Sequence, residues 1–123
     1  MTKRISTHHD LTVWQESMQL VSETYALTKK LPREEMFGLT TQMRRSAVSV
    51  PSNIAEGAAR QTKKEFVQLL HISKGSLSEL DTQLEIARRL EYLGKIEWEA
   101  LNNLLERVDK MLSGLIRHLR VTR

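Results

Sequence analysis

Apolar residues recur at steps of three and four along nearly the whole chain, and this spacing most restricts how the chain can fold. It places apolar side chains on one side of an α-helix, whereas a half-buried strand would need alternation at every second residue. Pro32, Gly57 and Gly94 interrupt the pattern and divide it into four segments. The sequence therefore predicts an all-α protein of four helices, and 123 residues suffice for one domain.

The first predicted helix carries two apolar faces. It begins after Asp10, the expected N-cap, and runs toward Leu31, since Pro32 disfavours a helical conformation in the residue before it. We expect one face to pack inside the protein and the other to meet something else; the alternative is a single wide core face. The first face has coiled-coil spacing and the second recurs every seven residues; they comprise Leu11, Trp14, Met18, Val21 and Tyr25, and Val13, Leu20 and Leu27.

The second predicted helix starts near Leu39 and contains an unusual stretch, RRSAVSVPSNIAEGAAR, at residues 44–60. Pro51 lies within its apolar spacing of Met43, Ala47, Val50 and Ile54. A proline inside a helix removes a hydrogen bond and costs ~3 kcal/mol or more, so we predict a kink at Pro51. The alternative is that the helix ends at Val50 and a new one begins with Pro51 in its first turn.

Three other residues of this stretch are predicted to be structural. Asn53 and Glu56 are expected to form fixed hydrogen bonds, either inside the bundle or between protomers, and Gly57 lies close to the helix end.

The third helix has the sharpest start signal in the chain. Thr62 and Glu65 match a capping box, in which the two residues satisfy backbone donors of the first turn. The helix is predicted to end near Leu93, with Gly94 as its left-handed C-cap. Its predicted seam follows heptad steps and comprises Phe66, Leu70, Ser73, Leu77, Leu80, Leu84 and Ala87. Around Gly75 the side chains are small, so a neighbouring backbone can approach there; the alternative is a local weak spot that costs ~1 kcal/mol. The small residues are Ser73, Gly75 and Ser76.

The fourth helix is predicted from about Ile96 to Leu119. Leu104 and Met111 form a second apolar stripe beside its main seam. Two pairs with favourable i to i+4 order, Glu85 with Arg89 on the third helix and Glu106 with Lys110 here, are expected to be solvated surface pairs. The main seam comprises Trp98, Leu101, Leu105, Val108, Leu112, Leu115 and Leu119.

Short connections favour an antiparallel up-down-up-down four-helix bundle at residues 11–120, with a flexible tail at 1–10 and a short one at 121–123. This topology gathers residues 1–10, 56–65 and 117–123 at one end. Eight basic residues then face three acidic ones there, although the net charge of the chain is only +4. The basic residues are Lys3, Arg4, Arg60, Lys63, Lys64, Arg117, Arg120 and Arg123, and the acidic ones are Asp10, Glu56 and Glu65.

Composition and motifs argue against an enzyme. The chain has no cysteine, so it lacks disulfides, thiolate metal sites and a cysteine nucleophile. Its four histidines, His8, His9, His71 and His118, form no recognised metal-ligand spacing, and no glycine-rich loop precedes a helix. We therefore predict no catalytic residue, no metal and no cofactor. The absence of a long apolar run predicts no membrane segment and a cytoplasmic location.

Three segments carry a family resemblance: LTVWQESMQL, FGLTTQMRRSAVSVPSNIAEGAARQTKKEF and HISKGSLSELDTQLEIARRLEYL. They resemble the four-helix bundle proteins encoded in intervening sequences of bacterial 23S rRNA genes. The same family includes the accessory variability determinant of diversity-generating retroelements. The resemblance implies a cytoplasmic bacterial protein that forms a ring-shaped homopentamer with a basic surface. In the retroelement branch it further implies an accessory subunit that binds reverse transcriptase and nucleic acid.

The leading hypothesis is a non-catalytic, basic, oligomeric protein that contacts the phosphates of RNA or DNA. Arg44 and Arg45 are about 100° apart on a helix, so one is expected to face solvent while the other pairs with Glu56 or an adjacent protomer. The alternatives are an adaptor ring that docks a partner enzyme such as a reverse transcriptase, and a purely structural oligomer. The predicted contacts are Arg44, Arg45, Arg60, Lys63 and Lys64, followed by Arg117, Arg120 and Arg123.

Overall fold

The computed structural model describes residues 7–121, and no strand occurs in that part of the chain. Four long α-helices and two short 3-10 helices make up the fold, which confirms the all-α class and the four helices. In chain order the elements are η1 (His8–Asp10), α1 (Thr12–Thr28), η2 (Arg33–Glu35), α2 (Leu39–Ala58), α3 (Lys63–Arg89) and α4 (Lys95–Val121).

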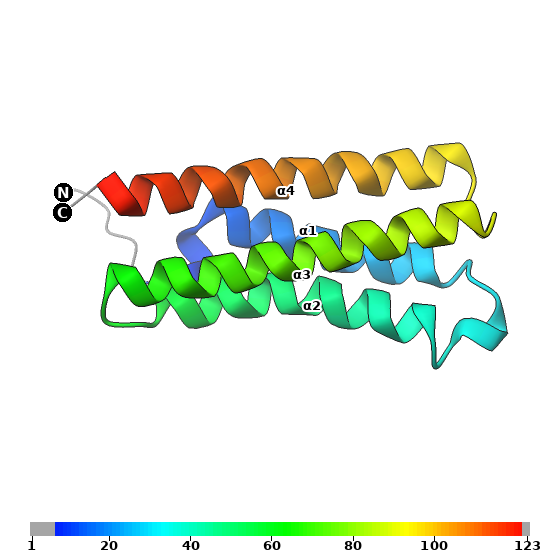
Figure 1. Ribbon diagram of the computed structural model, residues 1–123, viewed down its shortest axis with the longest axis horizontal. Helices are drawn as coiled ribbons and strands as arrows, with labels where there is room; N and C mark the ends of the chain where they lie inside the picture. The colour runs from blue at the N-terminus through cyan, green and yellow to red at the C-terminus, as the bar shows by residue number, and fades with distance from the viewer. Residues whose placement is uncertain (1–6, 122–123) are drawn as a thin grey trace.

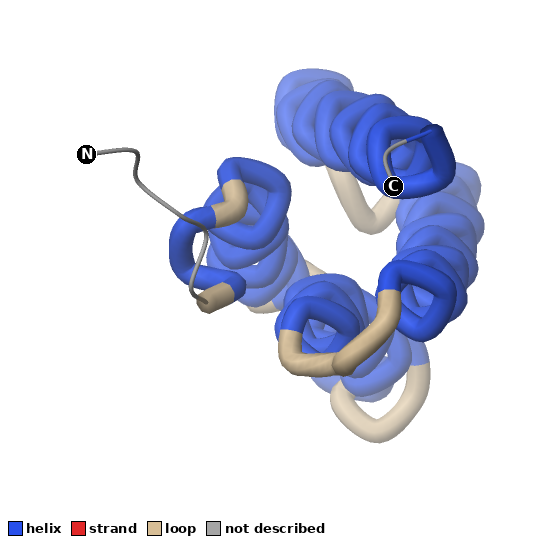
Figure 2. The backbone as a smooth tube through the Cα atoms, turned by 90° about the vertical axis from the view of Figure 1, so that its left-hand side faces the viewer, coloured by secondary structure: helices blue, strands red, loops and turns tan. Residues whose placement is uncertain are grey.

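The four helices lie side by side around a common centre. Figure 1 shows the chain running along α1, returning along α2 and repeating this course along α3 and α4. Viewed end on in Figure 2, each helix has two neighbours, and α4 lies between α3 and α1. The start of α1, the α2–α3 turn and the end of α4 therefore share one end of the bundle, which we call the basic end. None of the described helices is long and apolar enough to cross a membrane.

One apolar core runs along the bundle axis, and it confirms the predicted seams of α2 and α3. Met43, Val50 and Ile54 of α2 are fully buried, as are Leu70 and Leu84 of α3. Burying a leucine or isoleucine side chain stabilises the fold by about 1.5–3 kcal/mol relative to leaving it exposed. These two helices also form the most extensive helix pair in the bundle.

On α1, the core face is the one that recurs every seven residues. Leu20 is completely buried, whereas Met18 and Tyr25 of the coiled-coil seam are 42% and 39% exposed. Ser17 and Thr24 complete the core face because each hydroxyl donates to a carbonyl of its own helix, Ser17 to Trp14 and Thr24 to Leu20, both at 2.7 Å. Such buried hydroxyls are satisfied locally. Counting apolar residues on each face leaves Ser17 and Thr24 out, so it does not identify which of the two faces of α1 packs in the core.

On α4 the predicted second stripe belongs to the core. Leu104 is buried beside Leu101 and Leu105, and Ile116 is buried where the seam had placed Leu115. Met111, Leu115 and Leu119 are partly buried and pack against the core. The core face of α4 is therefore wider than a coiled-coil seam.

α2 continues through Pro51, so the alternative that the helix ends at Val50 is wrong. Side chains of the next turn serve nearby carbonyls: Ser52 Oγ donates to the Val48 carbonyl at 2.8 Å and Asn53 Nδ2 to the Ser49 carbonyl at 2.8 Å. These bonds offset part of the cost of the proline, which itself cannot donate. The kink at Pro51 stays a prediction.

The α1 and α3 helices begin in different ways. Thr62 caps α3 as predicted, because its hydroxyl accepts from the Glu65 backbone N–H at 3.1 Å and donates to the Glu65 carboxylate at 2.9 Å. The N-cap of α1 is Leu11 and not Asp10. Asp10 is instead the last residue of η1, which packs on α1 with the His8 and His9 rings 4.9 and 4.8 Å from the Trp14 ring. The described residues of the predicted N-terminal tail are therefore folded onto α1.

α3 ends earlier than predicted, and its left-handed residue is Glu91 and not Gly94. Glu91 has φ 62°, and no glycine in the described residues has a positive φ. The Tyr92 N–H bonds to the Ala87 carbonyl at 3.0 Å and the Glu91 N–H to the Arg88 carbonyl at 2.9 Å. This pair of bonds is the Schellman motif, which satisfies the last carbonyls of a helix.

Small residues bring α2 and α3 close together. Ser73 Oγ donates to the Val50 carbonyl at 2.8 Å, and the hydroxyls of Ser49 and Ser76 lie 2.7 Å apart. The predicted close approach of a backbone therefore occurs at Ser73. Gly75 takes no part in it, because an added Cβ would meet nothing within 4 Å, so the weak-spot alternative applies to Gly75.

Gly57 is the glycine that the α2–α3 contact requires. A Cβ at this position would lie 2.8 Å from Phe66 Cδ1 and 3.2 Å from Leu69 Cβ. Both distances are shorter than ordinary van der Waals contact, so a side chain would push the first turns of α3 away from the last turn of α2.

We predict opposite effects for the same substitution at these two glycines. Gly57→Leu should lower the free energy of unfolding by about 1–3 kcal/mol, the usual cost of overpacking. Gly75→Leu, its matched control, should raise it by about 0.5–1 kcal/mol because leucine has the higher helix propensity. Urea denaturation of both variants measures these changes. Equal effects at the two positions would contradict the close packing at Gly57.

At the end opposite the basic end, Glu85 holds Arg88, which connects the end of α3 to the start of α4. Its carboxylate accepts from Arg88 at 2.6 and 3.0 Å and from Arg89 Nε at 2.9 Å, which confirms the predicted Glu85–Arg89 pair. The Arg88 guanidinium also lies over the Trp98 ring, 5.1 Å from its centroid. Hydrogen bonds from Arg88 and then Arg89 lower the pKa of Glu85 from 4.5 to about 2.

This pKa shift predicts a pH-dependent contribution to stability. A carboxyl with a depressed pKa stabilises the fold above its unfolded-state pKa, and the contribution is lost as pH falls through the folded-state pKa. The stability difference between the wild type and Glu85→Gln should therefore be largest at pH 7 and shrink between pH 4.5 and about 2. Urea denaturation across this range measures it, with Glu79→Gln on the same helix as the control. A difference that does not change with pH would contradict the assignment.

Candidate nucleic-acid interface

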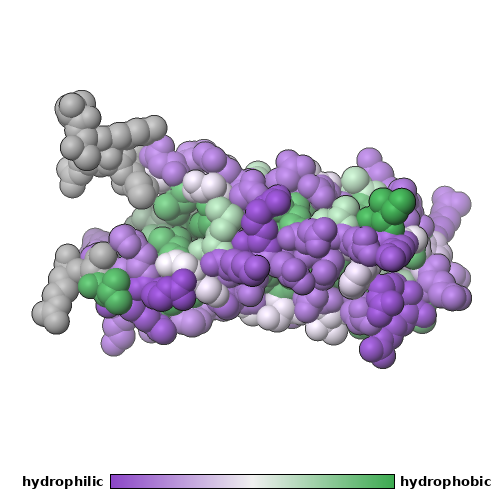
Figure 3. Space-filling view, turned by 90° about the horizontal axis from the view of Figure 1, so that it is seen from above, coloured by the Kyte–Doolittle hydropathy of each residue, from purple (hydrophilic) through white to green (hydrophobic). Residues whose placement is uncertain are grey.

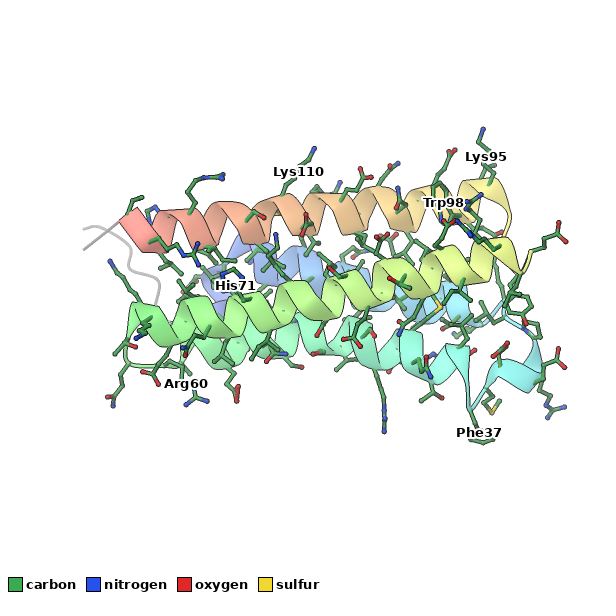
Figure 4. The ribbon with its side chains drawn as sticks, in the orientation of Figure 1. Phe37, Arg60, His71, Lys95, Trp98 and Lys110 are labelled. Atoms are coloured by element: carbon green, nitrogen blue, oxygen red, sulfur yellow. The ribbon has the colours of Figure 1, made fainter. Side chains whose placement is uncertain are left out.

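One side of α3 presents basic and polar residues to α4 near the basic end. Lys64, Val67, His71 and Lys74 follow one another at steps of three and four, so they share a helix face. Figure 4 shows His71 on the side of α3 nearest α4. Thr62 caps α3 directly before Lys63, so all of these residues belong to the helix.

Two adjoining hollows lie between α3 and α4 on this side, and we call them together the α3–α4 groove. They have volumes of about 380 and 440 Å³ and share His71 and Arg120. The first is lined by Lys63, Lys64, Val67, Gln68, His71, Leu119 and Arg120, and the second by His71, Lys74, Ser113, Ile116, Arg117, Arg120 and Val121.

The groove is positively charged. Two bases from α3, Lys63 and Lys64, oppose Arg117 and Arg120 from α4, and none of the described residues lining the two hollows is acidic. Arg120 Nη2 lies 3.0 Å from His71 Nε2. Because a guanidinium can only donate, His71 Nε2 accepts and the ring proton is on Nδ1. The contact holds the imidazole and the guanidinium together where the two hollows meet.

Lys74 marks the inner limit of the positive region. Its ammonium donates to Ser113 Oγ at 2.6 Å and lies 3.3 Å from Asp109 Oδ1. Further from the basic end, the hollow between the same two helices is lined by Asp81, Glu106 and Asp109. The charged residues that line the space between α3 and α4 therefore change from basic to acidic beyond Lys74.

The predicted contact residues fall into separate regions. Lys63, Lys64, Arg117 and Arg120 line the groove. Arg60 lies at the same end beside the α2–α3 turn, where Figure 4 shows it on the opposite side of α3 from α4, and it pairs with Glu56 at 3.5 Å. Arg123 lies outside the described residues.

Arg44 and Arg45 lie on α2, away from the groove. Arg45 and Ala58, the last residue of α2, are separated by about 20 Å along a helix that rises 1.5 Å per residue. Arg44 Nε donates to Thr28 Oγ1 at 2.9 Å, and its guanidinium lies 4.6 Å from the centroid of the Tyr25 ring. Arg44 thus connects α2 to α1, and neither its hydrogen bond nor its ring contact involves Glu56. Arg45 is the exposed member of the pair, as predicted for one of them.

Asn53 and Glu56 have different surroundings. Asn53 is partly buried and donates to the Ser49 carbonyl and hydroxyl at 2.8 and 2.9 Å, so its internal role agrees with the prediction. Glu56 is exposed and pairs with Arg60, which lies just beyond the end of α2, so an internal role for Glu56 is wrong. A role for Glu56 between protomers stays a prediction.

Sequence reasoning missed several residues of the groove. Val67, Gln68, His71, Lys74 and Leu119 line the groove but were not among the predicted contacts. A signal was present in the sequence, because His71 and Lys74 share a helix face with the predicted contact Lys64. That signal gains meaning only when α4 is known to face them. No group of three or more potential metal ligands occurs among residues 7–121.

Comparisons with known proteins agree with this fold. A family model described as 23S rRNA-intervening sequence protein matches residues 9–114. The chain is also similar to a crystal structure from Bacteroides thetaiotaomicron, a protein of unknown function from the S23 ribosomal protein family. The two share 28% sequence identity with a TM-score of 0.79, over 85% of this chain and 98% of that one. None of the curated proteins compared with this chain matches it.

Proposed function

The chain belongs to the 23S rRNA-intervening sequence protein family, and we propose that it is a non-catalytic protein that binds the phosphates of RNA or DNA in the α3–α4 groove. The convergence of Lys63, Lys64, Arg117 and Arg120 on hollows with no acidic described residue carries this proposal. Phosphate contacts of this kind supply most of the affinity of binding that does not depend on sequence.

The extent of the groove favours a polyanion over a single small anion. Lys64 and Lys74 are ten residues apart on α3, which corresponds to about 15 Å. The bases are thus spread along the groove and do not surround one point. An extended chain with regularly spaced phosphates matches that distribution, and the acidic residues beyond Lys74 confine it to the basic end.

Binding should weaken steeply with salt. If the four bases each neutralise one phosphate, the logarithm of the binding constant should fall with the logarithm of salt concentration with a slope of about −2.8 to −3.6. A charge reversal in the groove should reduce the magnitude of that slope by about 1 or more.

We predict that Arg117→Glu lowers affinity for an RNA oligonucleotide at least about tenfold at low salt, because it replaces a phosphate contact with a repulsive charge. Lys110→Glu is the matched control, since it makes the same charge change on the same helix, and Figure 4 shows Lys110 directed away from α3. Fluorescence anisotropy with a labelled RNA measures both.

Equal losses in Arg117→Glu and Lys110→Glu would show that net charge, and not the groove, drives binding. Arg45→Glu reports whether the more distant arginines contribute. A binding constant that does not respond to salt would overturn the phosphate-contact proposal.

We further propose that the protein works as a homo-oligomer, a ring-shaped pentamer as the family resemblance implies. The support is an apolar surface formed by Met18 and Tyr25 of α1 and Val48 of α2, all about 40% exposed. Exposed apolar patches on soluble proteins often mark interaction sites, and a ring needs contacts between unlike faces of adjacent protomers. The same surface supports the second candidate function, an adaptor that docks a partner such as a reverse transcriptase.

Two substitutions on this surface separate the alternatives. If the surface joins protomers, Met18→Glu should convert the oligomer to monomers in analytical ultracentrifugation, because a carboxylate would be buried without a partner. Gln19→Glu, at the adjacent exposed position, introduces the same charge and should leave the mass unchanged. A wild-type protein that is monomeric at micromolar concentration would contradict the ring and favour the adaptor.

A further inference from the structure

We infer that the α3–α4 groove takes a short single-stranded segment of nucleic acid, with unstacked bases in its two hollows, and does not take a duplex. This inference rests on the proposed function, and it concerns which form of nucleic acid the same site accepts.

The walls of the groove are not uniformly charged. Val67 and Leu119 line the first hollow between the basic residues, and Ile116 and Val121 line the second. A duplex presents phosphates and sugars to a helical surface and keeps its base faces stacked inside, so it offers nothing apolar to these side chains. A single strand can turn a base out of its stack and place the flat face on them.

The groove also holds planar groups on which bases stack. His71 and Arg120 contact each other where the two hollows meet, and both the imidazole ring and the guanidinium are planar. Single-stranded RNA is commonly recognised by stacking on histidine rings and arginine planes. The pair is therefore placed to separate two bases, one in each hollow.

Polar side chains beside each hollow suit the edges of a base. Gln68 lines the first and Ser113 the second. An amide and a hydroxyl can each donate and accept a hydrogen bond, so they pair with the edges of any base. Volumes of about 380 and 440 Å³ fall within the ~300–1,000 Å³ range of small-ligand sites, so each hollow has room for a planar ring.

The length of the bound nucleic-acid segment is limited at the inner end of the α3–α4 groove. Lys74 bonds to Ser113 and pairs with Asp109 at the inner end of the second hollow, and Asp81 and Glu106 follow. Phosphates that continued along the bundle would meet these carboxylates. The strand must therefore leave the groove near Lys74.

The test compares unpaired oligouridine with a blunt RNA duplex that carries the same number of phosphates, both measured by fluorescence anisotropy at one fixed low salt concentration. The wild type should bind the single strand at least about tenfold more tightly. His71→Ala should weaken single-strand binding about fivefold or more, at the lower end of the loss expected for one stacked base, and weaken duplex binding by a smaller factor. Gln68→Ala should have a smaller effect in the same direction.

Ile72→Ala serves as the control, because Ile72 is exposed on the same helix and lines neither hollow. His71 is exposed, so its variant should retain the wild-type melting temperature, which circular dichroism checks. Equal wild-type affinity for the two probes, or an equal loss of affinity for both in His71→Ala, would overturn the single-strand inference. The proposed function would still stand if binding of the probes weakened with salt. Failure of both probes to bind at low salt would overturn both proposals.

Discussion

The close contact between α2 and α3 is the interaction on which the rest of the structure depends. Gly57 lets the end of α2 pack directly against Phe66 and Leu69, and Ser73 donates to the Val50 carbonyl in the middle of the pair. Small side chains on both helices allow this approach, and their hydroxyls satisfy polar groups that close packing would otherwise bury unpaired. Once one face of α3 is held against α2 in this way, an adjacent face of α3 is turned toward α4.

That constraint links the fold to the candidate interface. The face of α3 directed at α4 carries Ser78 and Asp81 in the middle of the bundle and Lys64, His71 and Lys74 near the basic end. In Figure 3, viewed from above, hydrophilic side chains cover most of the visible surface, and apolar ones show in a hollow on the α1 side of α4, near the end where α4 finishes. In the α3–α4 groove, Val67, Ile116 and Leu119 line the walls beside the basic residues, a combination that suits a ligand with both phosphates and bases.

The polar stretch of α2 now has a mainly structural explanation. Arg44 connects α2 to α1 through Thr28 and Tyr25, Asn53 bonds to Ser49, and Ser49 meets Ser76 of α3. α2 therefore uses polar side chains to hold both of its neighbours. An arginine engaged in this way contributes packing and hydrogen bonds as well as charge, so its presence in a basic protein does not identify it as a phosphate contact.

The sequence by itself determined the four helices, the Thr62 cap, the buried seams of α2 and α3, and the collection of basic residues at one end. These features depend on local chemistry or on periodicity within one helix, which are present in the linear pattern. Only the tertiary structure decided that the heptad-spaced face of α1 is the core face, that Glu91 ends α3, and that His71 and Lys74 join Arg117 and Arg120 in one groove. Periodicity gives the angle between residues around a helix axis but not how that helix is turned toward its neighbours. The buried hydroxyls of Ser17 and Thr24 donate to carbonyls of their own helix. Because these polar residues lie on the core face of α1, the two faces do not differ clearly in hydrophobicity, and the sequence does not show which one is turned to the core.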